Sequence, residues 1–247
     1  MTTPDIATTF HHFFKLVMAD TAALRDEVYR IRYQVYCQEL HYEDAKAFPD
    51  GLEHDIYDAR SRHCLLLHRD TDTYAGCVRL VFNDNRDPNR VLPFEQFCAN
   101  SLHRDDLNPG VLDRSSFGEI SRLAVPANFR RRKKDLESPV GEISEPSPED
   151  SEDKRQFPSI ALGLYLAAAS IGLDAGLEGV FAMMEPRLAR HLMRFGIQFQ
   201  QIGDVVNYHG PRAAFYINRN MLFRKLRPEL LELLDAVQSD LVTGVRH

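Results

Sequence analysis

Apolar and polar residues follow one another in blocks along this chain of 247 residues, and their spacing predicts both strands and helices. Short apolar runs bounded by polar or turn residues are typical of buried strands. Such runs occupy residues 13–19, 62–68, 74–82, 117–126, 179–185, 197–208 and 213–219. The polar turn RDTDT joins the second run to the third, so these two runs predict a β-hairpin.

Other stretches have apolar residues every three or four positions, or are apolar over many residues, and predict helices. These stretches are 21–40, 159–176, 186–196 and 227–242. Thr21 or Asp20 suits the N-cap of the first, while Pro186 and Gly196 suit the start and the end of the third. The order of elements predicts an α/β (α+β) fold, with a central mixed β-sheet flanked by helices on both faces. We expect a single domain over residues 1–247.

Composition describes an ordinary globular chain, with 44% hydrophobic and 27% charged residues. The 36 Asp and Glu outnumber the 30 Lys and Arg, giving a formal net charge of -6. This balance disfavours a protein that coats nucleic acid or anionic membranes. No stretch reaches the roughly 20 apolar residues of a membrane-spanning helix, and the first residues lack the features of a secretory signal. We therefore expect a cytoplasmic protein without an integral membrane segment.

Residues 133–158 are rich in Pro, Ser, Glu and Asp, and predict a mobile insertion outside the core. Between residues 135 and 153 there are eight acidic residues and no basic one, so the rest of the chain has a formal charge of -6 + 8 = +2. A cationic run at 130–134 precedes the insertion. It is either a solvated surface, a partner of the acidic insertion, or a docking site for an acidic molecule.

The four cysteines are scattered, which predicts buried free thiols and neither a zinc knuckle nor a redox pair. His63 and His68 lie in one predicted strand at an odd spacing, so their rings are expected on opposite faces. We expect no metal site.

Nucleotide-binding motifs of the G-x-G-x-x-G and P-loop types are missing, as is the G-x-S-x-G motif of many serine hydrolases. Charged residues inside apolar elements are more informative. Arg32 and Tyr36 share a face of the first helix, and Arg79 and Arg122 lie within strands. Strand alternation places Glu119 on the face opposite Arg122 unless a bulge re-aims one of them. Each charge either faces solvent, forms a structural ion pair, or belongs to a buried site.

The combination of four segments resembles the acyl-homoserine lactone synthases and the related long-chain N-acyl amino acid synthases. The segments are RYQVYCQELHY (32–42), LEHDIYD (52–58), GCVRL (76–80) and EISRLAV (119–125). The basic run, the acidic insertion and the late YHGPR segment (208–212) look most like the acyltransferases associated with the PEP-CTERM/exosortase system.

This resemblance implies the fold of the GCN5-related N-acetyltransferases (GNAT), in which two central strands splay around a pantetheine arm. It also implies a fatty acyl thioester donor, usually on acyl carrier protein, and an amine acceptor of amino-acid type, with no permanently bound cofactor. The residues that correspond to the family's signature positions are Arg32, Tyr36, Tyr42, Asp55, Asp58, Arg79, Glu119 and Arg122. Tyr36 and Tyr42 stand where the lactone synthases more often have Phe and Trp.

Acyl transfer to an ammonium requires a proton acceptor, and Glu119 is the first candidate. The oxyanion of the tetrahedral intermediate requires donors, which the backbone N–H groups of Leu123, Ala124 and Val125 could supply. Asp55 and Asp58 are expected to organise the segment after the first helix through arginine pairs.

The segment VPANFRRRKK lacks the glycine-rich loop that grips coenzyme A in ordinary acetyltransferases. Arg130, Arg131 and Arg132 are therefore the candidates for docking a carrier protein. Helix 159–176 and the strand containing Met183 and Met184 either line an acyl tunnel or form ordinary core.

Tyr208 and Arg212 are candidates for binding the acceptor, with Arg212 as the match for a carboxylate. Two alternatives stay open. One is a coenzyme A-dependent GNAT N-acetyltransferase, and the other is a non-catalytic acyl-carrier or lipid-binding module.

Overall fold

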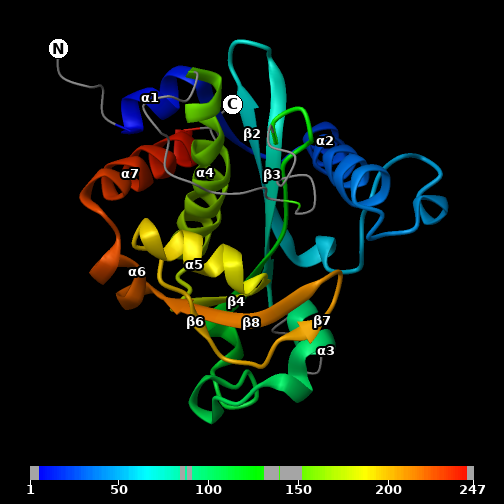
Figure 1. Cartoon of the computed structure of the whole chain (residues 1–247), viewed down its shortest axis with the longest axis vertical. Coiled ribbons are helices and arrows are strands. Elements are labelled where there is room, and N and C mark those ends of the chain that lie inside the picture. Colours follow the sequence, from blue (N-terminus) through cyan, green and yellow to red (C-terminus); the bar gives the residue numbers. More distant parts are fainter. Residues whose placement is uncertain (1–5, 84–86, 88–90, 131–138, 140–151, 244–247) are drawn as a thin grey trace.

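The computed structural model describes residues 6–83, 87, 91–130, 139 and 152–243, and its centre is one eight-stranded mixed sheet (Figure 1). The strands lie in the order β1-β2-β3-β4-β5-β8-β6, and β7 pairs with β8. Their bounds are β1 Phe14–Met18, β2 Ser61–His68, β3 Thr73–Phe82, β4 Phe117–Ala124, β5 Gly179–Met184, β6 Gln200–Gln201, β7 Val206–Asn207 and β8 Pro211–Asn218. All pairs are antiparallel except β4 with β5. The α/β fold with a central mixed sheet is confirmed.

Helices cover both faces of the sheet. Their bounds are α1 Ile6–Phe13, α2 Ala22–Arg32, α3 Pro93–Cys98, α4 Glu152–Asp174, α5 Pro186–Arg194, α6 Arg219–Lys225 and α7 Pro228–Thr243. Helices α1, α4 and α7 pack with α5 and α6 on one face, while α2 and α3 lie on the other (Figure 1). Strand alternation builds these layers, since Cys64 and Leu66 face the α4 side whereas Leu65 faces α2.

The predicted helix 21–40 is present, but it changes geometry along its length. Thr21 caps its start by accepting the Leu24 N–H at 3.2 Å. After α2 the chain continues as a π-helix over Tyr33–Glu39. This wider turn is a common feature of functional sites and carries Tyr36 into the interior.

Three helices and several boundaries differ from the predictions. Helices α1, α3 and α6 were not predicted, because each is short and its apolar residues span only one or two turns. Helix α4 begins at Glu152, inside the stretch assigned to the insertion. The segment 197–208 forms only the two-residue strands β6 and β7, not one long strand. Most of the predicted insertion lies outside the described residues.

The two central parallel strands separate after a short paired region. Strands β4 and β5 pair from Phe117 with Gly179 to Ile120 with Ala182. Beyond this point β4 continues against β3, and β5 continues against β8. The backbone edges of β4 and β5 therefore open into a fork.

A β-bulge lies in β4 at the start of this fork. Cys77 pairs with Ala124 and Arg79 pairs with Ser121, so β4 holds one extra residue. Arg122 occupies the bulge with a φ of 49°, in the left-handed region that a non-glycine residue rarely adopts. The bulge turns Arg122 toward the same cavity as Glu119 and Ser121. Strand alternation places Arg122 opposite Glu119 unless a bulge intervenes, and the structure contains that bulge.

All four cysteines are buried and free, as predicted. Within the described residues no three His, Cys, Asp or Glu side chains are grouped as ligands of a metal ion. In the same part of the chain, no helix is long and apolar enough to cross a bilayer.

Candidate active site

Charged side chains from α2, β3 and the loop after α2 meet in the interior. Arg32, which is fully buried, donates from Nη1 to Asp58 Oδ1 at 2.7 Å and forms a second ion pair with buried Glu53. Arg79, also buried, donates from Nη1 to Asp55 Oδ1 at 2.6 Å and to Asp58 Oδ1 at 2.8 Å. The interpretation that these charges face solvent is wrong. Paired guanidinium and carboxylate groups explain how they are buried.

Arg122 links this network to the aromatic part of the site. Its Nη2 donates to Glu43 Oε1 at 2.8 Å and lies 3.1 Å from Glu53 Oε1. The guanidinium lies over the ring of Tyr36 at 5.2 Å. Tyr36 in turn donates its hydroxyl to the carbonyl of Leu123 at 2.9 Å. The network therefore fixes the backbone of the bulged strand.

The paired carboxylates are poor proton acceptors. Burial raises the pKa of Asp58, but the guanidinium groups of Arg32 and Arg79 outweigh it and hold that pKa well below its usual range. The pKa values of Asp55 and Glu53 are lowered in the same way by their arginines against the opposing effect of burial. Burial lowers the pKa of His63 to about 4, so this neighbour of Asp58 is neutral near pH 7.

A cavity of about 250 Å³ opens beside the network, and Glu119 lies in its wall. The side chain is 2% exposed, and its Oε2 accepts the backbone N–H of Phe94 at 2.8 Å. Burial raises the pKa of Glu119 to about 8, although the Phe94 N–H and the charge of Arg79 lower it. The pKa of Glu119 thus moves opposite to that of Asp55, a second carboxylate in the cavity wall, whose arginine partner lowers its pKa. The raised pKa of Glu119 suits a group that exchanges protons near neutral pH.

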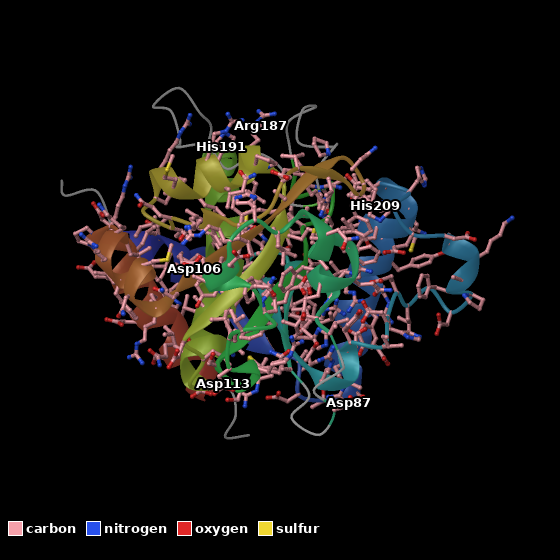
Figure 2. The ribbon with its side chains drawn as sticks, turned by 90° about the horizontal axis from the view of Figure 1, so that it is seen from below. Asp87, Asp106, Asp113, Arg187, His191 and His209 are labelled. Carbon is pink, nitrogen blue, oxygen red and sulfur yellow. The ribbon has the colours of Figure 1, made fainter. Side chains whose placement is uncertain are left out.

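Aromatic rings and a guanidinium line the rest of the cavity. Tyr42 stacks on His209 with ring centroids 4.6 Å apart, and Tyr208 lies against Phe97 at 4.2 Å. Figure 2 shows His209 on the same side of the molecule as α2. Arg212 lies over Tyr42 at 5.7 Å and has no carboxylate oxygen within 4 Å among the residues that the structure describes. It is thus a cation at the cavity wall without a fixed counter-ion.

The fork between β4 and β5 holds a second, smaller cleft that adjoins this cavity. Tyr36, Arg122 and Arg212 line both spaces. Pro139 also lines the cleft, and its carbonyl accepts the N–H of Val125 at 2.9 Å. The Val125 N–H, one of the candidate oxyanion donors, is therefore engaged here. Leu123 lines the cleft, while Ala124 pairs with Cys77 of β3.

Arg130, the first residue of the basic run after β4, is not exposed for docking. Arg130 is 1% exposed and forms an ion pair with Glu39, which also accepts the N–H of Ala127 at 3.1 Å. The prediction that Arg130 contacts a carrier protein is wrong, because the guanidinium holds the end of β4 against the π-helix. Arg131 and Arg132 lie outside the described residues.

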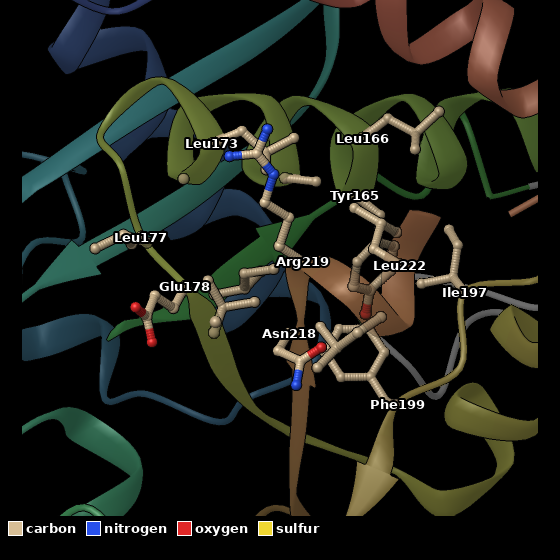
Figure 3. A pocket seen from close by; sticks show the side chains of 16 residues that line it. Tyr165, Leu166, Leu173, Leu177, Glu178, Ile197, Phe199, Asn218, Arg219 and Leu222 are labelled. Carbon is tan, nitrogen blue, oxygen red and sulfur yellow. The ribbon is translucent and has the colours of Figure 1, made fainter. Parts of the chain in front are cut away.

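An apolar pocket lies on the α4 side of the sheet (Figure 3). Its wall combines Leu166 and Leu173 of α4 with Phe199, Arg219 and Leu222. Ile120 and Tyr165 line both this pocket and the fork cleft. Of the predicted tunnel elements, α4 and β5 do line the pocket, but Met183 and Met184 line the cleft.

Several residues of the site had no role assigned from the sequence. Glu53 belongs to the segment LEHDIYD, and its burial identifies it as the partner of Arg32. Glu43 and Ser121 bind Arg122 and Arg79 through contacts that sequence spacing does not reveal. Phe94 supplies the N–H to Glu119 from the unpredicted helix α3.

Comparison with known proteins gives a family match to part of the chain. The acetyltransferase (GNAT) domain family matches residues 31–136. These residues include the π-helix, the buried charge network and β4. No curated protein matches the sequence.

Solved structures of two enzyme types are similar to this chain. The acyl-homoserine lactone synthase LasI has a TM-score of 0.53 and 15% identity, over 87% of this chain and 95% of that chain. The CoA-dependent acyl-homoserine lactone synthase BjaI, solved with SAM and isopentyl-CoA, has a TM-score of 0.57 and 18% identity over 91% and 89%. FeeM, an N-acyl amino acid synthase from uncultured soil microbes, has a TM-score of 0.54 and 14% identity over 88% and 97%. At these identities the likeness establishes a GNAT-type fold.

The family match and the fold together support an acyltransferase. The geometry is compatible with this class, because a cavity with a buried carboxyl group of raised pKa in its wall opens beside a fork that two strands leave in the sheet.

Proposed function

We propose that this protein is a cytoplasmic N-acyltransferase that moves a fatty acyl group from an acyl carrier protein thioester to the amine of an amino-acid-type acceptor. The observation that carries the proposal is Glu119, a buried carboxyl group with a raised pKa in the wall of a cavity next to the fork. The YHGPR segment at 208–212 and the acidic insertion are the grounds for also proposing an association with the PEP-CTERM/exosortase system.

The reaction removes two protons from the acceptor nitrogen and exchanges a C–S bond for a C–N bond. The acceptor ammonium gives a proton to the Glu119 carboxylate, and the free amine attacks the thioester carbonyl. A C–N bond forms, the C–S bond breaks, and the leaving thiolate takes a proton back from Glu119. The attacking nitrogen, now bonded to the acyl carbon, loses its second proton to solvent and becomes the amide nitrogen. A carboxylate of ordinary pKa would be too weak a base to take the proton from the ammonium. A pKa of about 8 lets Glu119 accept that proton and later give it to the thiolate.

The thioester carbonyl is proposed to lie in the fork. Backbone N–H groups of an extended strand alternate in direction, so those of Leu123 and Val125 point to the edge that β5 leaves open. These two are the proposed donors to the oxyanion, while Ala124 faces β3. The donor must replace the Pro139 carbonyl at the Val125 N–H.

Arg212 is proposed to bind the carboxylate of the acceptor, because the other cavity-lining guanidinium groups already hold carboxylates. We expect Arg212→Gln to raise the KM for the acceptor by about tenfold to a hundredfold, the loss of one charge-assisted pair. The KM for the donor should change little. Initial rates against each substrate in turn would test this, and an unchanged acceptor KM would contradict it.

The apolar pocket beyond the fork is proposed to hold the acyl chain. Ala169 of α4 lines it, so Ala169→Phe should fill part of the space. We expect kcat/KM for long acyl donors to fall by more than about tenfold, with short-chain donors as the internal control. Equal losses for short and long chains would show that the pocket has another role.

Turnover of defined donors and amines tests the proposal as a whole. Acyl carrier protein and coenzyme A thioesters of the same acyl group are offered with amino acids, and thiol release and product mass are followed. The expected result is an N-acylated amino acid whose formation depends on both substrates. Turnover of acetyl-coenzyme A alone would indicate an acetyltransferase, and binding without turnover would indicate an acyl-binding module.

A further inference from the structure

The turn between β7 and β8 places an imidazole ring in the wall of the cavity that holds Glu119. Residues 208–210 form this turn, and the Tyr208 N–H donates to the Gly210 carbonyl at 2.9 Å. His209 lies between these two residues and lines the cavity. Its φ is 51°, in the left-handed region that few residues other than glycine adopt. Backbone conformations of this kind are concentrated at functional sites.

Neighbouring side chains hold the imidazole in place. The ring of His209 stacks on Tyr42, with centroids 4.6 Å apart and planes 19° from parallel. Tyr208 packs against the same ring at 4.4 Å, close to edge-on. The hydroxyl of Tyr208 accepts a hydrogen bond from Arg122. The turn is therefore fixed both to the loop after the π-helix and to the bulged strand β4.

The ring nitrogens of His209 are available to a substrate. Within the part of the chain that the structure describes, neither nitrogen has a hydrogen-bond partner. Burial lowers the pKa of His209 and outweighs the nearby charge of Glu43, which raises it. The charges of Arg212 and Arg122 lower it further. The ring is therefore neutral near pH 7, and one of its nitrogens can accept a proton.

The proposed binding of the acceptor brings its nitrogen close to this ring. The guanidinium of Arg212 and the ring of His209 both lie against Tyr42, at 5.7 and 4.6 Å from its ring centroid. In an α-amino acid only one carbon separates the amine from the carboxylate. An acceptor carboxylate on Arg212 therefore places the amine beside His209. Glu119 reaches the same cavity from β4, so two bases line it from different elements.

Amide formation has a use for two bases. Glu119 takes the first proton of the ammonium and returns it to the thiolate. The second proton is still on the nitrogen when the tetrahedral intermediate forms. Until that proton leaves, the intermediate can expel the amine again instead of the thiolate. A base beside the nitrogen therefore commits the intermediate to the amide.

We infer that His209 is a second catalytic base, which takes this second proton from the acceptor nitrogen. The inference rests on the proposed function for the reaction and for the position of the acceptor. The neutral imidazole accepts the proton, the C–S bond breaks, and the thiolate takes the proton held by Glu119. The imidazolium then gives its proton to solvent. One proton is released for each amide formed, and both bases return to their starting forms.

Replacement of the imidazole by a phenyl ring tests the inference. His209→Phe keeps a ring to stack on Tyr42 but cannot accept a proton, so kcat should fall by about a hundredfold. The KM values for donor and acceptor should stay within about twofold, because Arg212 and the fork are unchanged. Initial rates with each substrate varied in turn measure both, and circular dichroism monitors folding. An unchanged kcat would overturn the inference.

Chemical rescue separates a base from a structural ring. Glycine suits the left-handed backbone at position 209, and His209→Gly leaves space beside Tyr42. Added imidazole should raise the turnover of this variant at least about tenfold. Pyrazole, which has the same shape but is a much weaker base, should not. His209→Phe should gain nothing from imidazole, because the phenyl ring fills the space. Equal rescue by pyrazole, or no rescue by imidazole, would contradict a proton-accepting role.

His41 provides a matched control for the substitution. It too has a left-handed backbone, with a φ of 54°, and it is exposed, with Nδ1 at 3.0 Å from the Cys37 carbonyl. Its ring is not among the described side chains of the cavity wall. His41→Phe should therefore keep the wild-type kcat. Equal losses in the two variants would overturn the inference, because they would reflect phenylalanine at a strained position.

The same measurements distinguish this inference from the proposed function. If the wild type forms the amide and His209→Phe forms it equally fast, the role of His209 is wrong while the function stands. If His209→Phe raises the acceptor KM and keeps kcat, the ring is a binding contact, and the inference is again wrong. If the wild type forms no amide from any donor, the proposed function and the inference both fail.

Discussion

Glu119→Gln is expected to lower kcat by about a hundredfold to ten-thousandfold while leaving the fold intact, which is the usual loss when a general base is removed. The amide keeps the shape of the side chain and can accept the Phe94 N–H at the same place. It cannot take a proton from the acceptor ammonium. Measurement of kcat at saturating donor and acceptor, with circular dichroism to monitor folding, would test this. Full turnover in a folded variant would contradict the role of Glu119.

The pH dependence of kcat gives a second readout of the same residue. Burial raises the pKa of Glu119 to about 8, so the active carboxylate is the minor form at pH 7 and becomes the major form above pH 8. In the wild type, kcat should therefore rise with pH through about 8. In Glu119→Gln this limb should be lost, leaving only the ionisation of the bound amine. A merely structural role of Glu119 would lower kcat equally at all pH values.

Arg32→Met is expected to reduce the free energy of unfolding by about 3–5 kcal/mol, because it leaves buried carboxylates without their partner. Arg32 is fully buried and holds both Glu53 and Asp58. Methionine fills much of the same volume, so the loss comes mainly from charge rather than from a cavity. Denaturant unfolding followed by circular dichroism measures the change. A loss below about 1 kcal/mol would show that the network does not hold the fold.

A matched control places the same substitution on the surface. Arg62 pairs with Asp174 at 3.1 Å, and both side chains are about half exposed. Arg62→Met should change the stability little, because exposed ion pairs contribute little. The stability loss of Arg32→Lys should lie between those of Arg32→Met and Arg62→Met. Lysine keeps the positive charge, but it lacks the planar guanidinium that pairs with two carboxylates.

Acid should weaken the same network in the wild type. The folded protein holds the pKa of Asp58 below the value of 3.8 that it has when unfolded, so this group stabilises the fold at pH values above 3.8. The stabilisation is lost as the pH falls below that value. Arg32→Met removes one of the charges that lower this pKa, so the variant should show a smaller acid-dependent loss.

Much of the sheet could be predicted from the sequence, because its strands are apolar runs with clear ends. The hairpin of β2 and β3 is an example, since RDTDT interrupts two runs that are almost wholly buried. Helix α2 could also be predicted, from its apolar spacing and from its N-cap at Thr21. By contrast, α3 supplies the N–H that binds Glu119, yet its six residues show no helical period.

The site was predicted less fully, because its geometry depends on contacts between distant segments. Spacing alone left Arg122 on the face opposite Glu119, and only the bulge at φ 49° brings them to one cavity. Arg130 had the sequence context of an exposed basic run, but the Glu39 carboxylate, 91 residues earlier, holds it inside.

Product mass after incubation with acyl carrier protein thioesters and a pooled set of amino acids decides whether the protein transfers an acyl group to an amine. We expect an N-acylated amino acid, with thiol release that requires the acceptor and that falls by at least about a hundredfold in Glu119→Gln. Thiol release independent of any acceptor, or no release from any carrier protein or coenzyme A thioester, would contradict the claim that this fold and this carboxyl group carry out N-acyl transfer.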